Sequence, residues 1–183
     1  GHRVAEREER VAGEGRRAEE ELRAAQALHA PLSDDQGILA ATIHDALSNV
    51  ASDRGDYDLA LVESRRAREL REALFGPDHP EVATTRNNLA RALIGLGALD
   101  EAEVELRGVL AIREAALGSA HPMVGNSLTN LANLADLRHD FAASVAANRR
   151  ALAIAEATYG PDHPNTATIH NNLGRALMRG GDL

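Results

Sequence analysis

The sequence contains no cysteine, no tryptophan and no lysine. Without cysteine the chain has no disulfides, thiolate metal sites or cysteine nucleophiles, which is compatible with a reducing compartment, and we expect a cytoplasmic protein. Aromatic residues make up only 2% of the chain, so its core must be built from leucine, alanine, valine and isoleucine. Because alanine and leucine are strong helix formers and strand formers are scarce, the composition predicts an all-α fold.

Positive charge is limited as well. The 20 basic residues, all arginine, stand against 28 acidic ones, which gives a net charge of −8 at pH 7. A general nucleic-acid binder carries a basic patch, so nucleic acid is not an expected partner. No apolar run approaches the ~20 residues of a membrane helix and no signal peptide is recognised, so no membrane partner is expected either.

Arginine without lysine, together with the excess of alanine, favours a GC-rich bacterial genome as the source. The chain opens with Gly1 and His2 and lacks an initial methionine. We interpret this opening as the remnant of a cleaved tag on a fragment of a larger bacterial protein.

A repeat of 42 residues organises most of the chain. The loop GPDHP at Gly76 recurs as GSAHP at Gly118 and as GPDHP at Gly160, and the same shift aligns three Asn-Leu pairs. Repeats of this length are typical of stacked helix pairs, because one thin pair cannot bury its own apolar surface. The predicted division is a degenerate partial repeat at 1–36, three repeats at 37–78, 79–120 and 121–162, and the first helix of a truncated repeat at 163–183.

Each repeat is expected to hold two helices. Pro80, Pro122 and Pro164 suit a first helical turn, so the histidine before each of them falls near the N-cap. Glycines at positions 55, 97 and 181 are expected to end the first helices in a left-handed turn, with His139 as the exception. Asp58 and Asp100 are the predicted starts of second helices.

The three loop histidines are weighed first as a metal site. Successive helices pack about 8–10 Å apart, whereas the ligands of one zinc lie within about 2.0–2.3 Å of it. We therefore interpret His79, His121 and His163 as residues that fix the turn between repeats, with no metal and no cofactor. No nucleophile elbow, phosphate-binding glycine loop or catalytic trio is recognised, so the sequence predicts a protein that is not an enzyme.

The segments HPEVATTRNNLARALIGLGALDEAEVELRGVLAIREAALG and HPNTATIHNNLGRALMRGGDL resemble tetratricopeptide repeats of the kinesin-light-chain type. The resemblance implies a right-handed superhelical solenoid of antiparallel helix pairs, whose concave groove binds a protein or peptide. The alanine- and arginine-rich style also resembles repeat regions of large bacterial signalling proteins, which implies a scaffold or regulatory role. The alternative is structural self-association, end to end or as a dimer, through exposed ends of the solenoid.

Polar side chains spaced three or four residues apart share one face of each first helix. In the resembled fold this face lines the groove, and asparagine can both donate to and accept from a peptide backbone. Arg91 and Arg175 could add a contact to a carboxylate. The candidate groove residues are Asp45, Asn49, Thr84, Asn87, Arg91, Asn126, Thr129, Asn133, Thr168, Asn171 and Arg175.

Two further sets of residues remain open between a structural and a ligand-binding role. Asn88, Asn130 and Asn172 either tie adjacent helices together or contact the ligand. His44, Arg86 and His170 occupy a position that is usually apolar in the resembled family. The two histidines at this position either line the groove or reach solvent at the edge of a helix.

Overall fold

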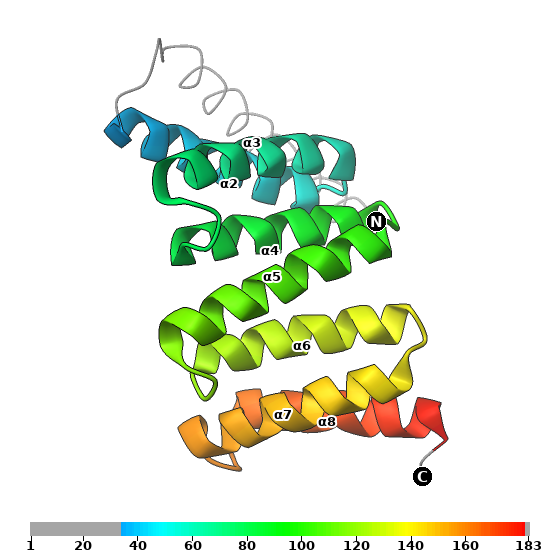
Figure 1. Cartoon of the computed structure of the whole chain (residues 1–183). Coiled ribbons are helices and arrows are strands. Elements are labelled where there is room, and N and C mark those ends of the chain that lie inside the picture. Colours follow the sequence, from blue (N-terminus) through cyan, green and yellow to red (C-terminus); the bar gives the residue numbers. More distant parts are fainter. Residues whose placement is uncertain (1–33, 182–183) are drawn as a thin grey trace, which may run out of the picture. The chain divides into compact units, whose positions relative to one another are not determined.

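The computed structural model describes residues 34–181, which form seven α-helices and no strand (Figure 1). In chain order they are α2 (Asp34–Asp53), α3 (Tyr57–Phe75), α4 (Pro80–Gly95), α5 (Leu99–Leu117), α6 (Pro122–Leu137), α7 (Phe141–Tyr159) and α8 (Pro164–Gly180). We refer to α2, α4, α6 and α8 as first helices and to α3, α5 and α7 as second helices. Of the predicted partial repeat at 1–36, residues 1–33 lie outside the described residues, and its last three begin α2.

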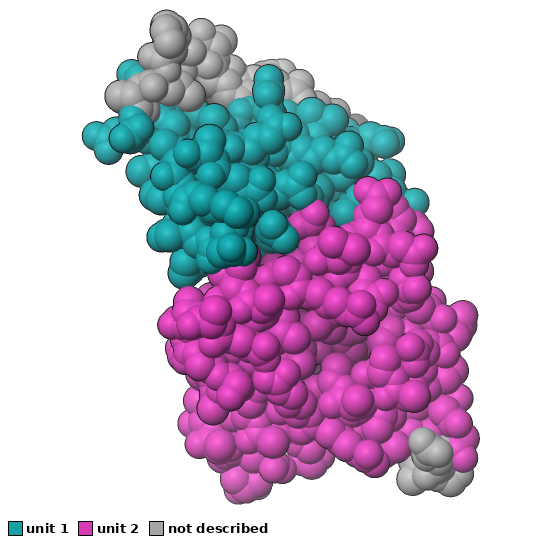
Figure 2. Space-filling view, viewed as in Figure 1, with its two compact units in different colours: residues 1–96 teal, residues 97–183 magenta. Residues whose placement is uncertain are grey.

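The chain divides into two compact units, residues 1–96 and 97–183 (Figure 2). In the first unit α3 packs against both α2 and α4, and α4 also touches α2. Ala51, Ala60 and Ala92 form a fully buried cluster among these three helices, with Leu59 and Leu61 packed against it. Because alanine adds only a methyl group, the three helices approach one another closely at this point.

The second unit places α6 against both α5 and α7, and α8 against α7. Its core is built mainly from branched side chains of α6, α7 and α8, with Leu110 and Leu152 packed against it: Val124, Leu128, Ala151, Ile154, Ala155 and Ile169. Burial of these apolar side chains is the main favourable contribution to folding of the unit.

The three His-Pro loops fold in the same way, as the sequence predicts. In α4, α6 and α8 the proline is the first helical residue and the histidine before it is the N-cap. The Nδ1 atoms of His79, His121 and His163 accept the N–H of the second helical residue at 3.2, 3.2 and 3.1 Å. Each histidine thus satisfies one of the N–H groups that a helix start leaves without a partner.

Two of the capping histidines are also held by an aromatic ring. Phe75 stacks on His79 and Tyr159 stacks on His163, each with ring centroids 4.8 Å apart. Gly76 and Gly160 follow the two rings and adopt φ values of 86° and 87°, which glycine reaches at little cost. The stacked pair therefore connects the end of a second helix to the start of the next first helix.

The turns inside the helix pairs confirm the predicted glycines and correct the predicted starts. Gly55, Gly97 and Gly181 have positive φ, and His139 takes the same conformation at φ 60°. Helices α3 and α5 begin earlier than predicted, because their N-caps are Asp56 and Ala98. The N-cap of α7 is Asp140. Asp58 and Asp100 instead lie in the first helical turn, where an acidic side chain faces the positive end of the helix.

Replacing His121 with alanine is expected to lower the free energy of unfolding by about 1 kcal/mol, because the N–H of Met123 loses its acceptor. His121→Asn should restore most of this loss, since the asparagine side-chain oxygen can accept the same bond. Urea denaturation followed by circular dichroism measures both changes. Equal stability of the alanine and asparagine variants would show that the histidine is not a functional cap.

Candidate functional site

The candidate groove residues of the first unit lie on α2 and α4 at different depths. Thr84 and Arg91 are exposed, while Asn49 and Asn87 are half-buried. Arg91 also holds α4 against α2, because its Nη2 donates to the Asn49 carbonyl at 3.1 Å and to Asp53 Oδ1 at 2.9 Å. The Arg91 guanidinium therefore has a fixed position at the surface of this unit.

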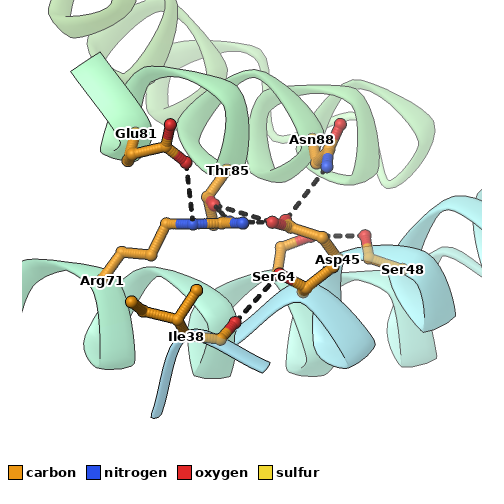
Figure 3. Close-up of polar contacts among 9 residues, drawn as sticks. Ile38, Asp45, Ser48, Ser64, Arg71, Glu81, Thr85 and Asn88 are labelled. Atoms are coloured by element: carbon orange, nitrogen blue, oxygen red, sulfur yellow. Dashed lines mark hydrogen bonds and ion pairs between the residues drawn. The ribbon is translucent and has the colours of Figure 1, made fainter. Parts of the chain in front are cut away.

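Asp45 differs from the other candidates because it is buried, with 7% of its surface exposed. Its carboxylate pairs with Arg71 of α3 and accepts hydrogen bonds at 3.1 Å from both Thr85 and Asn88 of α4 (Figure 3). These contacts occupy both carboxylate oxygens. Asp45 therefore belongs to the interior of the unit, and we remove it from the candidate groove.

The Arg71 guanidinium joins all three helices of the first unit, since it also donates to Thr85 and lies 3.8 Å from Glu81 (Figure 3). Burial lowers the pKa of Arg71 from its ordinary value, and the nearby Glu81 carboxylate partly opposes this shift. The hydrogen bond from Asn88 to Asp45 completes the network. Asn88 is thus a tie between helices, which is one of its two open interpretations.

The second unit contains a related tie. Arg113 of α5 stands 42 residues after Arg71, and its Nη1 donates to Ser127 Oγ of α6 at 2.9 Å and to the Met123 carbonyl at 3.3 Å. Burial lowers the pKa of Arg113 as well. Ser127 takes the position that Thr85 has one repeat earlier. An arginine on a second helix and a hydroxyl on the following first helix therefore make the same contact in both units.

The position shared by His44, Arg86 and His170 is also explained by pairing. His44 Nδ1 lies 2.6 Å from Glu63, Arg86 Nη2 lies 3.4 Å from Glu72, and His170 Nε2 lies 3.4 Å from Glu156. Each partner is a glutamate of a second helix. The basic residue at this position thus connects a first helix to a second helix.

Most candidate residues of the second unit are exposed on α6 and α8: Asn126, Asn133, Thr168, Asn171 and Arg175. Thr129 is half-buried. The hydroxyls of Thr129 and Thr168 donate to carbonyls of their own helices, at 3.1 and 3.0 Å. They keep the capacity to accept a hydrogen bond from a partner.

Asn133 and Arg175 line a cavity of about 490 Å³ in the second unit, together with Asp136, Leu137, His139 and Arg179. Asp136 is buried, and its Oδ2 lies 3.3 Å from Arg175 Nε and 3.7 Å from Arg179 Nη1. Its Oδ1 is buried too and accepts no hydrogen bond from the part of the chain that the structure describes. The guanidiniums of Arg175 and Arg179 and the carboxylate of Asp136 thus meet at this cavity. The exposed amide of Asn133 also lines it.

Arg175 and Arg179 each contact a further side chain that helps to hold the guanidinium in place. Arg175 Nη2 donates to Asn172 Oδ1 at 3.3 Å, so Asn172 acts within its own helix. The Arg179 guanidinium lies over the Phe141 ring, 5.2 Å from its centroid, which favours a cation–π contact. The repeat pattern does not point to Asp136, Leu137, His139 or Arg179 as site residues, because these residues do not recur with the repeat.

The remaining candidate residues form two polar faces. The polar face of the first unit consists of Asn49, Thr84, Asn87 and Arg91 on α2 and α4. The polar face of the second unit consists of Asn126, Thr129, Asn133, Thr168, Asn171 and Arg175 on α6 and α8.

Within residues 34–181, no group of three histidine or acidic side chains could hold a metal ion. No helix among these residues is long and apolar enough to cross a membrane.

The family model of the tetratricopeptide repeat matches three overlapping stretches of the chain, residues 39–107, 93–157 and 138–183. These stretches together span most of the sequence and include every residue of both polar faces. Among the curated proteins compared with the chain, none matches it.

Solved structures share the fold. BtubC (BKLC) from P. vanneervenii has a TM-score of 0.82 at 23% identity, and the match covers 93% of this chain and 68% of that one. Two structures of putative kinesin light chain nearly identical TPR-like repeats from Podosopora anserina, one of them a variant with a single substitution, have TM-scores of 0.69 and 0.70 at 25% and 24% identity. Each match covers 75% of this chain and 65% of that chain. The predicted all-α helix-pair solenoid and its likeness to kinesin-light-chain-type repeats are confirmed.

Proposed function

The chain belongs to the tetratricopeptide repeat family, and we propose that it binds a peptide or a segment of a partner protein along the polar faces of its first helices. Repeats of this family generally mediate protein–protein interactions and typically serve as scaffolds without catalysis. Because each repeat contacts only its neighbours, such folds present extended surfaces that suit extended ligands.

The cavity beside Asn133 and Arg175 is the observation that carries this proposal. Two residues chosen from the repeat pattern and the family resemblance line a cavity of about 490 Å³ on the polar face of the second unit. Arg175 and Arg179 supply two positive charges against one carboxylate, so the cavity lining favours a ligand with hydrogen-bond acceptors.

The exposed asparagines give the polar face its chemistry. Asn133 and Asn171 are exposed on α6 and α8, and each amide can donate and accept at the same time. An extended peptide presents an N–H and a C=O at almost every residue, so a row of amides can bind it with little dependence on its side chains. In the first unit Asn87 and Arg91 stand at the positions of Asn171 and Arg175 two repeats later and offer related contacts.

We further propose that the chain is a scaffold or regulatory region of a larger bacterial signalling protein. The use of arginine without lysine and the excess of alanine support the bacterial origin, and the signalling role rests on the resemblance to repeat regions of large bacterial signalling proteins. The full-length sequence would test it directly. A neighbouring kinase or nucleotide-switch domain would support a signalling role, and a parent protein without any signalling domain would contradict it.

The groove proposal can be tested with an array of random peptides about twelve residues long. Peptides selected by the natural chain are expected to lose about tenfold or more in affinity when Asn133 and Asn171 are both replaced by alanine, a typical loss for central contacts of an interface. Fluorescence polarisation with the labelled peptides measures the change. Both side chains are exposed, so the double substitution should leave the fold intact.

Arg149→Ala provides the matched control, because Arg149 is exposed on α7, outside the polar face. It should leave the affinity of the selected peptides unchanged. If the asparagine double variant binds them as tightly as the natural chain does, the assignment of the polar face is wrong.

Self-association is the second candidate function, and exposed apolar side chains of the second unit favour it. Met178 and Leu137 are 64% and 54% exposed. Light scattering over a concentration series measures the mass of the particle. A constant monomer mass up to high concentration would exclude this function, whereas a concentration-dependent dimer that Met178→Asp abolishes would support it.

A further inference from the structure

A second cavity lies in the second unit among α5, α6 and α7, and its volume is about 340 Å³. Figure 2 shows the surface of this unit hollowed between α5 and α7. The cavity has an apolar floor from α6 and a wall of alanines from α7: Leu128, Leu131 and Leu134, then Ala143, Ala146 and Ala147. None of these side chains belongs to the polar face.

The alanine wall explains why the cavity exists. At the same repeat positions α5 carries Glu101, Val104 and Glu105, and α3 carries Leu59, Val62 and Glu63. Helix α7 therefore has three of its shortest side chains where the other second helices have long or branched ones. The space that a longer side chain would fill stays open above the leucines of α6.

Three arginines stand in the lining of this cavity: Arg107 on α5, Arg138 after α6 and Arg150 on α7. Two carboxylates, Glu103 and Asp140, line it as well. The lining thus carries one net positive charge, in a chain whose net charge is −8.

Both lining carboxylates are already engaged within the protein. Asp140 caps α7 by accepting the N–H of Ala143 at 3.0 Å. Glu103 lies 2.7 Å from Arg107 and 3.2 Å from Arg138. Glu103 therefore already pairs with two of the lining arginines, and Asp140 is hydrogen-bonded at the start of α7.

The arginines can exchange partners readily. Arg138 also pairs with Asp100, whose side chain is 90% exposed, and Arg150 pairs with Glu114. A pair with a side chain as exposed as Asp100 contributes little to stability, so giving that pair up costs little, whereas the Glu114 side chain is only 32% exposed. Each guanidinium has five N–H donors, and two of them can hold one carboxylate side by side.

From this geometry we propose that the cavity binds a small amphipathic carboxylic acid. The apolar body of the ligand rests on Leu128, Leu131 and the alanines of α7, and its carboxylate pairs with Arg138 and Arg150. A volume of about 340 Å³ lies at the lower end of the range of about 300–1,000 Å³ for small-molecule sites. The ligand is therefore about the size of a single aromatic ring or of two fused aromatic rings. This site is independent of the peptide proposal.

Two probes of equal shape test the proposal: 2-naphthoate and the neutral 2-naphthalenemethanol. Each is titrated into the full chain, and binding is followed by NMR from the backbone amides of Ala143, Ala146 and Ala147. We expect naphthoate to bind saturably at these amides, with a Kd about tenfold or more below that of the alcohol, because only the acid can pair with the arginines.

Two single substitutions separate the parts of the site. Ala147→Leu fills the cavity and should abolish naphthoate binding, while Arg150→Gln removes one of the two guanidiniums that hold the carboxylate and should weaken naphthoate binding toward the affinity of the alcohol. Arg149→Gln, at the exposed neighbouring position, should change nothing. Arg150 is 43% exposed, so its variant tests the proposal even where Ala147→Leu disturbs packing.

Three results would overturn the proposal. The first is the absence of saturable shifts with naphthoate at millimolar concentration, and the second is equal binding of acid and alcohol. The third is a naphthoate affinity that stays the same as that of the natural chain in both the Ala147→Leu and Arg150→Gln variants.

Discussion

Replacing Asp45 with alanine is expected to lower the free energy of unfolding by about 3–5 kcal/mol, the range observed when one member of a buried ion pair is removed. The Asp45 and Arg71 side chains are only 10% and 9% exposed. Without the carboxylate, the Arg71 charge stays buried with Thr85 and the more distant Glu81 as its neighbours. Urea denaturation followed by far-ultraviolet circular dichroism measures the loss.

Asp53→Ala on the same helix is the control. The Asp53 side chain is 75% exposed and pairs with Arg91 at the surface, so its loss should cost no more than about 1 kcal/mol. The double variant Asp45→Leu/Arg71→Met should recover most of the stability, because it removes both buried charges and keeps apolar volume. Equal destabilisation by Asp45→Ala and Asp53→Ala would show that the buried network does not hold the unit together.

Replacing Gly95 with leucine is expected to destabilise the chain by about 1–3 kcal/mol through overpacking. A Cβ at Gly95 would overlap Cγ and Cδ1 of the Tyr57 ring, and rotating the ring about its Cβ–Cγ bond does not move Cγ out of the way. The clash outweighs the gain of about 1 kcal/mol that leaving glycine brings to a helix interior. Thermal unfolding measures the net effect.

Gly174→Leu on α8 is the matched control, because, apart from the local backbone of α8, no atom of the described residues lies within 4 Å of an added Cβ there. It should leave stability unchanged or raise it by up to about 1 kcal/mol. Tyr57→Ala in the Gly95→Leu background should recover part of the loss by making room. Gly95→Leu as stable as Gly174→Leu would contradict the close packing of Tyr57 on α4.

The loops could be predicted from the sequence because their chemistry is local. A histidine followed by proline sets an N-cap and a first turn within two residues, and the structure shows this arrangement at His79, His121 and His163. The positive φ of Gly55 follows in the same way from what glycine alone tolerates. Because these local features recur every 42 residues, they together predict a row of stacked helix pairs.

The sequence predicts the start of α3 at Asp58, two residues after the N-cap Asp56, because both aspartates are suitable capping residues. Asp56 directly follows the left-handed Gly55, and its Oδ1 accepts the N–H of Leu59 at 3.2 Å. Asp58, the predicted start, lies inside the first turn. Only the backbone geometry of the turn decides between two equally good capping residues.

Helix periodicity places Asp45 on a polar face, which the family resemblance assigns to the groove, and it cannot show the burial of Asp45. The spacing of polar residues identifies a face of one helix, but the neighbour that covers part of this face comes from another. Arg71 of α3 and Thr85 of α4 reach Asp45 from 26 and 40 residues away. No pattern within α2 contains that information.

The two cavities depend on packing for the same reason. Asp136 and Arg179 meet Arg175 at one of them although they do not follow the repeat. The other exists because three alanines of α7 stand opposite the leucines of α6. The sequence shows that these alanines replace longer side chains of the other repeats, but only the packed structure shows that the space they leave stays open.

The most direct test of the proposed function is to map which backbone amides respond when an array-selected peptide binds the natural chain in an NMR titration. Our account predicts that the largest shifts fall on the polar faces, at Thr84, Asn87 and Arg91 of α4 or at Asn133, Asn171 and Arg175 of α6 and α8. Shifts confined to the second helices α3, α5 and α7, with the first helices unchanged, would contradict it.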